Sequence, residues 1–240
     1  MSETKFTFKR FEKKYLLSAE QCESLWRELA PRLEKDEYPE STVCSIYYDT
    51  DDYRLIRHSI DAPVYKEKLR LRSYNIPGPE DTVFVELKKK FKGIVYKRRV
   101  SMSAREATGW LAGRNPAPED SQMTREIDWF LRSVQPKPKV FLACDRLAFR
   151  GKEDPELRIT FDRNIRWREE DLDLCAGDRG EPLLEAGQVL MEIKIPGAAP
   201  LWLAHLLSEQ QLFPVGFSKY GTCYKEHILN EYIFGGSTHA

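Results

Sequence analysis

The sequence predicts an α+β fold: a closed, mostly antiparallel β-barrel with a polar interior, flanked by helices. Two observations lead to this expectation. About eight segments alternate polar and apolar residues, as strands do, and other segments repeat apolar residues with the period of an amphipathic helix. Because the polar strand faces are strongly charged, we expect them to line a water-filled bore, with the apolar faces packed beneath the helices.

The clearest strand pattern runs from Val64 to Val100, in three strands separated at residues 75–79 and 92–93. Short gaps favour antiparallel pairing. One face of the first strand is entirely basic, and like charges on one strand face repel each other. The four cations on this face are Lys66, Lys68, Arg70 and Arg72. An ordinary solvated surface is the alternative, but an all-basic face favours an anionic ligand, and the planar arginine fork matches phosphate.

The segment before these strands contains a strand, a helix and a second strand. Residues 5–17 alternate as a strand, and Ser18 to Gln21 form a capping box that predicts a helix as far as about Leu33. Residues 43–49 predict the second strand. The pattern over residues 53–61 does not distinguish helix from strand.

After the basic strands, helices and strands continue to the end of the chain. A capping box at Ser103 to Glu106 predicts one helix. We expect further helices at 121–133, 199–210 and 218–233, strands at 140–150, 155–162, 165–168 and 189–195, and a mobile loop at 169–187. No repeat or linker divides the sequence. The prediction is a single domain over residues 1–240, with a core of about 5–233 and a flexible C-terminal tail.

Composition restricts the class of protein. The 240 residues hold 38 basic and 38 acidic side chains, so the net charge is zero, which argues against a nucleic-acid-binding protein. Five scattered cysteines without a CxxC pair argue against a disulfide framework or a zinc site. The charged N-terminus is unlike a secretory signal, and no run of about 18 apolar residues predicts a membrane span. We therefore expect a cytoplasmic protein without a transmembrane segment; oligomeric state is not predicted.

A set of motifs resembles a known family. Taken in order, RFEKKYLL at 10–17, SIYYDT at 45–50, KLRLRSY at 68–74, VFVELKKK at 83–90, LRITFD at 157–162, LMEIKIPG at 190–197 and FSKYGT at 217–222 resemble the VTC domain. That is the catalytic domain of polyphosphate polymerases, within the triphosphate tunnel metalloenzyme superfamily. The resemblance covers about residues 5–230. It implies an eight-stranded antiparallel tunnel barrel and transfer of the ATP γ-phosphoryl group to a growing polyphosphate chain, with Mn²⁺ or Mg²⁺.

The resemblance also implies roles for individual residues. The implied catalytic phosphate ligands are Arg70, Arg72, Lys88, Arg146 and Arg158. The implied substrate-binding residues are Lys14, Arg10, Lys68, Lys194 and Lys219. The implied metal ligands are Glu192, Glu12 and Glu86. Structural ion pairs are the alternative for several of them: Arg146 or Arg158 with Asp145 or Asp162, Glu192 with Lys194, and Glu12 with Lys14.

Three functions remain open on this fold. A polyphosphate polymerase would bind ATP and inorganic polyphosphate, and a membrane protein is a possible partner. A triphosphatase on the same barrel and a non-catalytic polyphosphate-binding module are the alternatives. The triphosphatase branch carries E-x-E-x-K in its first strand, where this chain has Arg10, Glu12 and Lys14. Arginine in place of a carboxylate replaces a metal ligand with a phosphate ligand, which favours the polymerase.

Overall fold

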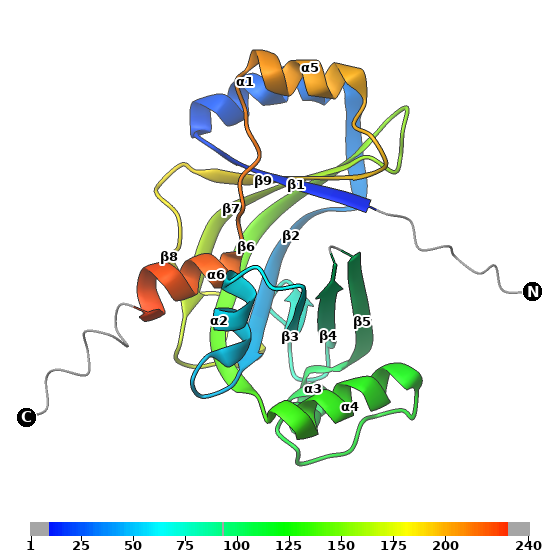
Figure 1. The fold of residues 1–240 in the computed structure, drawn as a ribbon, viewed down its shortest axis with the longest axis vertical. Helices are drawn as coiled ribbons and strands as arrows, with labels where there is room; N and C mark the ends of the chain where they lie inside the picture. The colour runs from blue at the N-terminus through cyan, green and yellow to red at the C-terminus, as the bar shows by residue number, and fades with distance from the viewer. Residues whose placement is uncertain (1–9, 93, 230–240) are drawn as a thin grey trace, which may run out of the picture. The chain divides into compact units, whose positions relative to one another are not determined.

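The computed structural model describes residues 10–92 and 94–229, and only the backbone of Arg10 and Phe11. Figure 1 shows strands with helices packed on them. The strands are β1 (Arg10–Leu17), β2 (Leu33–Asp49), β3 (Tyr65–Tyr74), β4 (Thr82–Phe91), β5 (Ile94–Ser103), β6 (Lys137–Gly151), β7 (Arg158–Arg168), β8 (Glu181–Pro182) and β9 (Val189–Pro196). The α-helices are α1 (Ala19–Leu29), α2 (Arg54–Ile60), α3 (Ala104–Leu111), α4 (Gln122–Val134), α5 (Leu201–Glu209) and α6 (Lys219–Cys223).

The strands form one sheet whose two ends are not joined. The order is β1-β9-β7-β6-β2-β3-β4-β5, with β8 paired to β7. In the part of the chain that the structure describes, β1 pairs only with β9 and β5 only with β4. The prediction of a closed eight-stranded tunnel barrel with a polar interior is therefore wrong. Alternation within a strand specifies which of its faces is buried, but it does not specify whether the first and last strands pair.

The chain divides into two compact units. Among the described residues, the first unit comprises 10–41, 145–164 and 184–217, and the second comprises 42–92, 94–144, 165–183 and 218–229. Antiparallel pairing joins β1 to β9 and β9 to β7 in the first unit, and β2 to β3, β3 to β4 and β4 to β5 in the second. Each unit therefore has a sheet surface of its own.

In the second unit, one face of β3–β5 packs against α3 and α4. Leu69 and Val85 from the strands share a buried cluster with Trp110 of α3 and with Ile127 and Phe130 of α4. Figure 1 shows the two helices at the end of β4 and β5 that lies away from the turn between these strands. The alternation in residues 64–100 correctly predicted which strand face lies under the helices.

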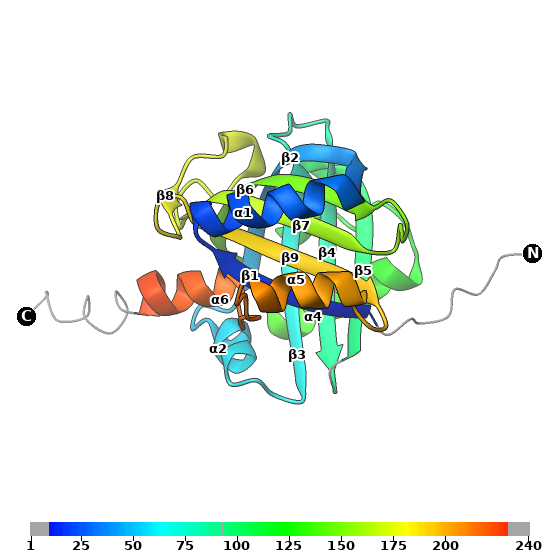
Figure 2. The ribbon, with the colours of Figure 1, turned by 90° about the horizontal axis from the view of Figure 1, so that it is seen from above.

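In the first unit, α1 and α5 cover the sheet. Ile159 of β7 and Ile193 of β9 share a buried cluster with Leu25 of α1 and Leu203 of α5, and Figure 2 shows both helices lying over β7 and β9. The capping box at Ser18 forms as predicted, with the Ser18 hydroxyl accepting from the Gln21 backbone N–H. The apolar strand face is again the helix-covered one.

Several local expectations needed correction or completion. The helix expected as far as about Leu33 ends at Leu29, and β2 begins at Leu33, ten residues before the predicted strand. Residues 158–168 form one continuous strand instead of a strand and a return strand, and Asn164 adopts a left-handed φ of 47°, a conformation that asparagine tolerates. The ambiguous stretch at 53–61 contains α2. Within residues 10–92 and 94–229, no helix is both long and apolar enough to span a membrane.

Candidate phosphate-binding site

The polar face of β3–β5 gathers cations from all three strands. Because the strands pair antiparallel in a fixed register, Lys68 lies opposite Lys88, which lies opposite Lys97. In the next polar row, Arg70 lies opposite Glu86, and Glu86 lies opposite Arg99. We call this surface the basic face; its residues are Lys68, Arg70, Arg72, Glu86, Lys88, Lys97 and Arg99.

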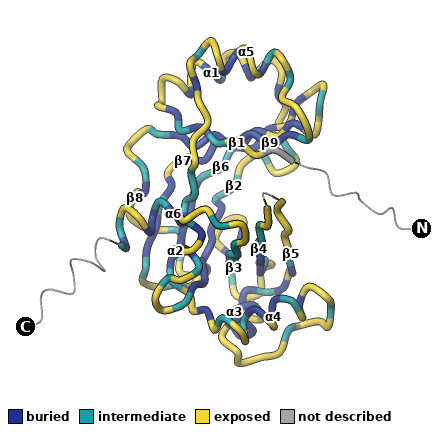
Figure 3. Tube along the Cα trace, in the orientation of Figure 1, coloured by how far each residue is buried: buried dark blue, intermediate teal, exposed yellow. Residues whose placement is uncertain are grey.

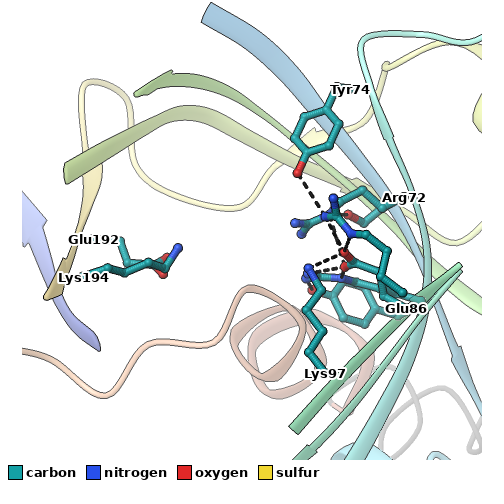
Figure 4. A network of polar contacts seen from close by, with 10 residues as sticks. Arg72, Tyr74, Glu86, Lys97, Glu192 and Lys194 are labelled. Carbon is teal, nitrogen blue, oxygen red and sulfur yellow. Dashed lines mark hydrogen bonds and ion pairs between the residues drawn. The ribbon is translucent and has the colours of Figure 1, made fainter. Parts of the chain in front are cut away.

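Glu86 lies at the centre of the basic face and is only 1% exposed. Its two carboxylate oxygens accept hydrogen bonds of 2.6 Å each from the Nε atoms of Arg70 and Arg99. The Lys97 Nζ lies 2.5 Å away, and the Arg72 Nε lies 3.9 Å away. Figure 4 shows Arg72 and Lys97 turned toward this carboxylate. One buried acid therefore orients four cations.

The charge balance of the basic face is strongly positive. Burial opposes ionisation of Glu86, but Arg70, Arg72 and Lys97 outweigh it and hold the pKa of Glu86 well below its usual range. The face therefore carries six cations and one carboxylate, a net charge of +5 on three short strands. Cations held in fixed positions, with N–H donors beyond those that Glu86 uses, form a surface suited to a polyanion such as a phosphate chain.

Hydroxyl groups around the basic face hold its arginines in place. The Tyr47 hydroxyl accepts a hydrogen bond of 3.2 Å from Arg70, and the Ser45 hydroxyl accepts one of 3.2 Å from Arg72. The Tyr74 hydroxyl likewise accepts from Arg99 at 3.1 Å. Burial raises the pKa of Tyr47, but the charges of Arg70, Arg72 and Lys68 outweigh it and lower that pKa to about 7. The surrounding cations thus favour the tyrosinate form of Tyr47.

Two of the sequence motifs are in contact through Tyr47 and Tyr220. The ring of Tyr220, from FSKYGT, stacks on Tyr47, from SIYYDT, with 4.8 Å between ring centroids. The Tyr220 hydroxyl donates to the buried carboxylate of Asp49 at 2.9 Å. The same carboxylate accepts from the backbone N–H groups of Leu55 and Ile56 in α2. Asp49 of β2 thus connects α2 and α6 to β2 by hydrogen bonds, and β2 pairs with β3 of the basic face.

The first unit carries a second polar group, centred on Glu192 of β9. Glu192 is buried and lies 2.7 Å from the Nζ of Lys194. In the sheet register, Lys14 of β1 and Thr160 of β7 lie on either side of it. Burial opposes ionisation of Glu192, but Lys194 and Lys14 outweigh it and lower the pKa of Glu192 to about 2. The acid is therefore ionised at any physiological pH.

The predicted arginines of the first unit take part in ion pairs. Arg146 binds the buried carboxylate of Asp162 through two hydrogen bonds of 2.6 and 2.7 Å. Arg158 lies 3.3 Å from Asp36, a partner that the sequence did not suggest. The Arg146–Asp162 ion pair, which was the alternative to a phosphate-binding role for Arg146, is thus present. Such a pairing fixes the guanidinium orientation and does not exclude phosphate binding by its other N–H groups.

The residues around Glu192 fit a divalent cation that takes most of its ligands from phosphate and water. Mg²⁺-type cations commonly use only one or two carboxylates of a protein together with phosphate oxygens. Glu192 supplies one carboxylate, and the buried Thr160 hydroxyl beside it has no hydrogen-bond partner. Among the described residues no three His, Cys, Asp or Glu side chains cluster into a complete metal cage. Such a metal would therefore need its substrate to complete its coordination.

The structure brings together many of the residues named from the sequence. Arg70, Arg72, Lys68, Lys88 and Glu86 share the basic face. Lys14, Glu12, Lys194 and Glu192 share one face of β1 and β9, with Lys14 3.5 Å from Glu12. Lys219 begins α6. The side chain of Arg10 lies outside the described residues. The metal roles of Glu192, Glu12 and Glu86 stay predictions, and both oxygens of Glu86 are already held by arginine and lysine.

Four contributors to the basic face were given no site role from the sequence. Lys97 and Arg99 alternate in β5 in the same way as Lys68 and Arg70 in β3, so their spacing already contained the signal. Tyr47 and Ser45 carried no such signal, because a neutral hydroxyl in a largely buried strand looks like core. Only the β2–β3 register, which pairs Tyr47 with Arg70 and Ser45 with Arg72, reveals their role.

The sequence matches a known family and a known relative. The family model of the VTC domain matches residues 9–228. Subunit 4 of the vacuolar transporter chaperone complex of Trypanosoma cruzi is 26% identical over 226 residues, which cover 75% of this chain and 27% of that protein. This chain therefore spans about a quarter of that relative.

Solved structures with similar folds have low sequence identity. A Bacillus halodurans protein provisionally assigned as an adenylate cyclase superposes with a TM-score of 0.52 at 18% identity, covering 86% of this chain and 92% of that one. A Vibrio parahaemolyticus protein with the same provisional assignment gives a TM-score of 0.47 at 13% identity, with coverages of 90% and 97%. The first of these similarities concerns the fold alone.

Proposed function

Because the chain belongs to the VTC domain family, we propose that it is a metal-dependent polyphosphate polymerase. It transfers the γ-phosphoryl group of ATP to a growing chain of inorganic polyphosphate. The observation that carries the proposal is the basic face, where buried Glu86 orients Arg70, Arg72, Lys97 and Arg99. This surface favours a ligand with several closely spaced negative charges.

The chemistry of phosphoryl transfer suits such a surface. The reaction requires in-line positioning and stabilisation of charge on the phosphoryl oxygens, with little covalent participation by the protein. The guanidinium groups of Arg70, Arg72 and Arg99 bind phosphate oxygens, and Lys68 and Lys88 add charge. Glu86 relieves the repulsion among the cations when no substrate is bound. Tyr47 and Ser45 hold two of the arginines in position.

In this proposal Mn²⁺ or Mg²⁺ is held by Glu192, with Glu12 as a further carboxylate, and Lys14 and Lys194 bind phosphate nearby. When bound, the cation neutralises charge on the phosphate oxygens. Arg146 and Arg158 add phosphate contacts from β6 and β7, oriented by their acidic partners. Lys219 and Arg10 complete the proposed set of substrate-binding residues.

A direct test incubates the purified protein with ATP and Mn²⁺ and analyses the products. A polymerase yields chains that migrate as a ladder on polyacrylamide gels, and ADP accumulates in proportion to the phosphate incorporated. Release of orthophosphate without chains would assign a triphosphatase. Tight polyphosphate binding without turnover would assign a binding module. Either of the last two outcomes contradicts the proposal.

A further inference from the structure

The apolar face of β3–β5 continues beyond the helices that cover it. Tyr65, Phe91 and Ile94 form the outermost cross-strand row of this face, and Tyr96 lies in the next row. None of these four side chains belongs to the buried cluster beneath α3 and α4. The contacts with α4 lie one and two rows inward from the outermost one, where Lys89 lies 3.9 Å from Glu126 and Arg98 pairs with Glu126 at 3.0 Å. We call residues 64–67, 89–92 and 94–96 the sheet tip.

Large apolar side chains at the sheet tip are exposed to solvent. The five from Tyr65, Phe91, Ile94, Val95 and Tyr96 are each between 42% and 45% exposed, and Val64 is 63% exposed. Figure 3 shows the end of β5 near the turn as exposed. Four of these side chains, Tyr65, Phe91, Ile94 and Tyr96, share one face of the sheet, while Val64 and Val95 lie on the other. Single exposed apolar residues are ordinary, but four on one face at the end of a sheet mark an interaction surface.

The sheet tip is also basic. It contains four lysines, Lys66, Lys89, Lys90 and Lys92, and one carboxylate, Glu67, so its net charge is +3 in a chain whose total is zero. Glu67 already lies 3.7 Å from Lys89. Lys66 lies opposite Lys90 in the register, and burial together with the Lys90 charge lowers the pKa of Lys66. Lys66 and Lys90 therefore repel each other and favour an anionic partner, whereas Lys89 lies close to Glu67 and Glu126.

We propose that the sheet tip docks on an anionic lipid surface, with Phe91, Ile94 and the tyrosine rings entering the interfacial region and the lysines contacting headgroups. Tyrosine and aliphatic side chains flanked by lysine are the composition of membrane-surface segments. A second copy of this chain is disfavoured, since a symmetric tip-to-tip contact would bring +3 against +3. Lys66 and Lys90 lie on the same side of the strands as the basic face, but the inference uses none of the seven residues that define the basic face and so does not depend on the proposed function.

Co-sedimentation with vesicles tests this inference. One set contains phosphatidylcholine alone, and the other also contains phosphatidylglycerol. Each lysine near an anionic surface strengthens binding about fivefold, so a net charge of +3 predicts a preference on the order of a hundredfold for the anionic set. The double variant Phe91→Ser with Ile94→Ser should lose most binding to anionic vesicles, and Lys90→Glu with Lys92→Glu should lose the preference.

Matched controls isolate the sheet tip. Phe213→Ser with Leu201→Ser removes one aromatic and one aliphatic side chain that are largely exposed elsewhere, and Lys35→Glu reverses an exposed charge far along the chain from the tip. These controls should bind like wild type, and circular dichroism should show every variant folded. Absent binding by the wild type, or unchanged binding by both tip variants, would overturn the inference. So would light scattering that shows a dimer lost in the tip variants.

Discussion

At the scale of single residues, Glu86 explains why so many cations can share one sheet face. If a neighbouring cation is removed, the negative charge of the buried carboxylate is no longer compensated. If that cation is an arginine, N–H donors for phosphate are lost as well. Four cations have a side-chain nitrogen within 4 Å of a Glu86 carboxylate oxygen: Arg70, Arg72, Lys97 and Arg99. The basic face is therefore a coupled group, in which single substitutions should affect both ligand binding and neighbouring side chains.

The arginine pair gives the first prediction. Arg70→Ala and Arg72→Ala should each lower ATP turnover at least about tenfold, the effect of losing one strong phosphate contact of about 1.4 kcal/mol. Arg105→Ala is the control, because Arg105 is an exposed α3 residue paired only with Glu80 among the contacts described. Steady-state kinetics measures the effect. Wild-type turnover in both variants would remove the pair from the site.

Glu192 gives a prediction about pH and stability. Its folded-state pKa of about 2 lies below the ordinary 4.5. The ionised form is thus stabilised by folding, and this contribution is present above pH 4.5 and lost as the pH falls through about 2. The shift corresponds to about 3 kcal/mol. Urea unfolding of wild type and Glu192→Gln at a series of pH values should show a difference near neutrality that disappears in acid.

The control for Glu192 is Glu23→Gln, which removes an exposed carboxylate paired with Arg27. An exposed pair contributes little, so this variant should follow wild type at every pH. If Glu192 also holds the metal, Glu192→Gln should lose the response of activity to Mn²⁺, because a neutral amide is a poor ligand for a hard dication. Equal stability of Glu192→Gln and wild type at neutral pH would contradict the ion-pair geometry.

Tyr47 gives a prediction about tyrosine ionisation. Its pKa of about 7 predicts that the ultraviolet absorbance of tyrosinate appears near neutral pH, well below the ordinary value of 10. Because the pKa of Tyr47 is lower in the folded state than in the unfolded state, ionisation of Tyr47 stabilises the folded protein. This stabilisation is fully present above pH 10 and is lost as the pH falls through about 7. Tyr47→Phe should remove the absorbance change near pH 7, and any early change that remains is expected from Tyr74, whose pKa is raised by burial but lowered on balance by Arg99 and Arg72. Tyr38→Phe, at an exposed tyrosine, should leave the change near pH 7 intact. Tyrosinate absorbance that begins only above pH 9 in wild type would contradict the prediction.

At the scale of elements, much could be predicted from sequence. Capping boxes located the starts of α1 and α3, and the alternation in 64–100 predicted three strands and their helix-covered face. The helical character of residues 54–60 was not predictable, because what holds the start of α2 is a side chain outside it: Asp49 accepts from the Leu55 and Ile56 N–H groups. Propensity within a seven-residue segment cannot report such a contact.

Asp49 gives the prediction at this scale. It is fully buried, and its carboxylate accepts from α2 and from the Tyr220 hydroxyl. Asp49→Ala leaves buried donors without an acceptor and should lower the free energy of unfolding by about 2–4 kcal/mol. The matched control is Asp51→Ala, at an exposed acid paired with Lys137 and Lys139, where a much smaller loss is expected because exposed ion pairs contribute little. Denaturant unfolding compares them, and similar losses in both would refute the anchoring role.

At the scale of the whole molecule, the candidate site was more predictable than the topology. Charged residues at alternate positions placed Arg70 and Arg72 on one face of their strand before any pairing was known, and the β3–β4 register shows that Lys88 shares this face. Closure of the sheet was not predictable in this way. It depends on whether β1 and β5 pair, and these strands lie at opposite ends of the strand order. Local patterns contain no information about that contact.

The central claim is that the basic face binds a phosphate chain, and titration calorimetry with inorganic triphosphate tests it most directly. Lys97 and Arg99 make the test specific, because they contact Glu86 and come from β5. Arg99→Ala should weaken triphosphate binding at least about tenfold, as should Arg72→Ala, while Arg105→Ala should bind like wild type. Equal triphosphate affinity in wild type, Arg72→Ala and Arg99→Ala would contradict the claim.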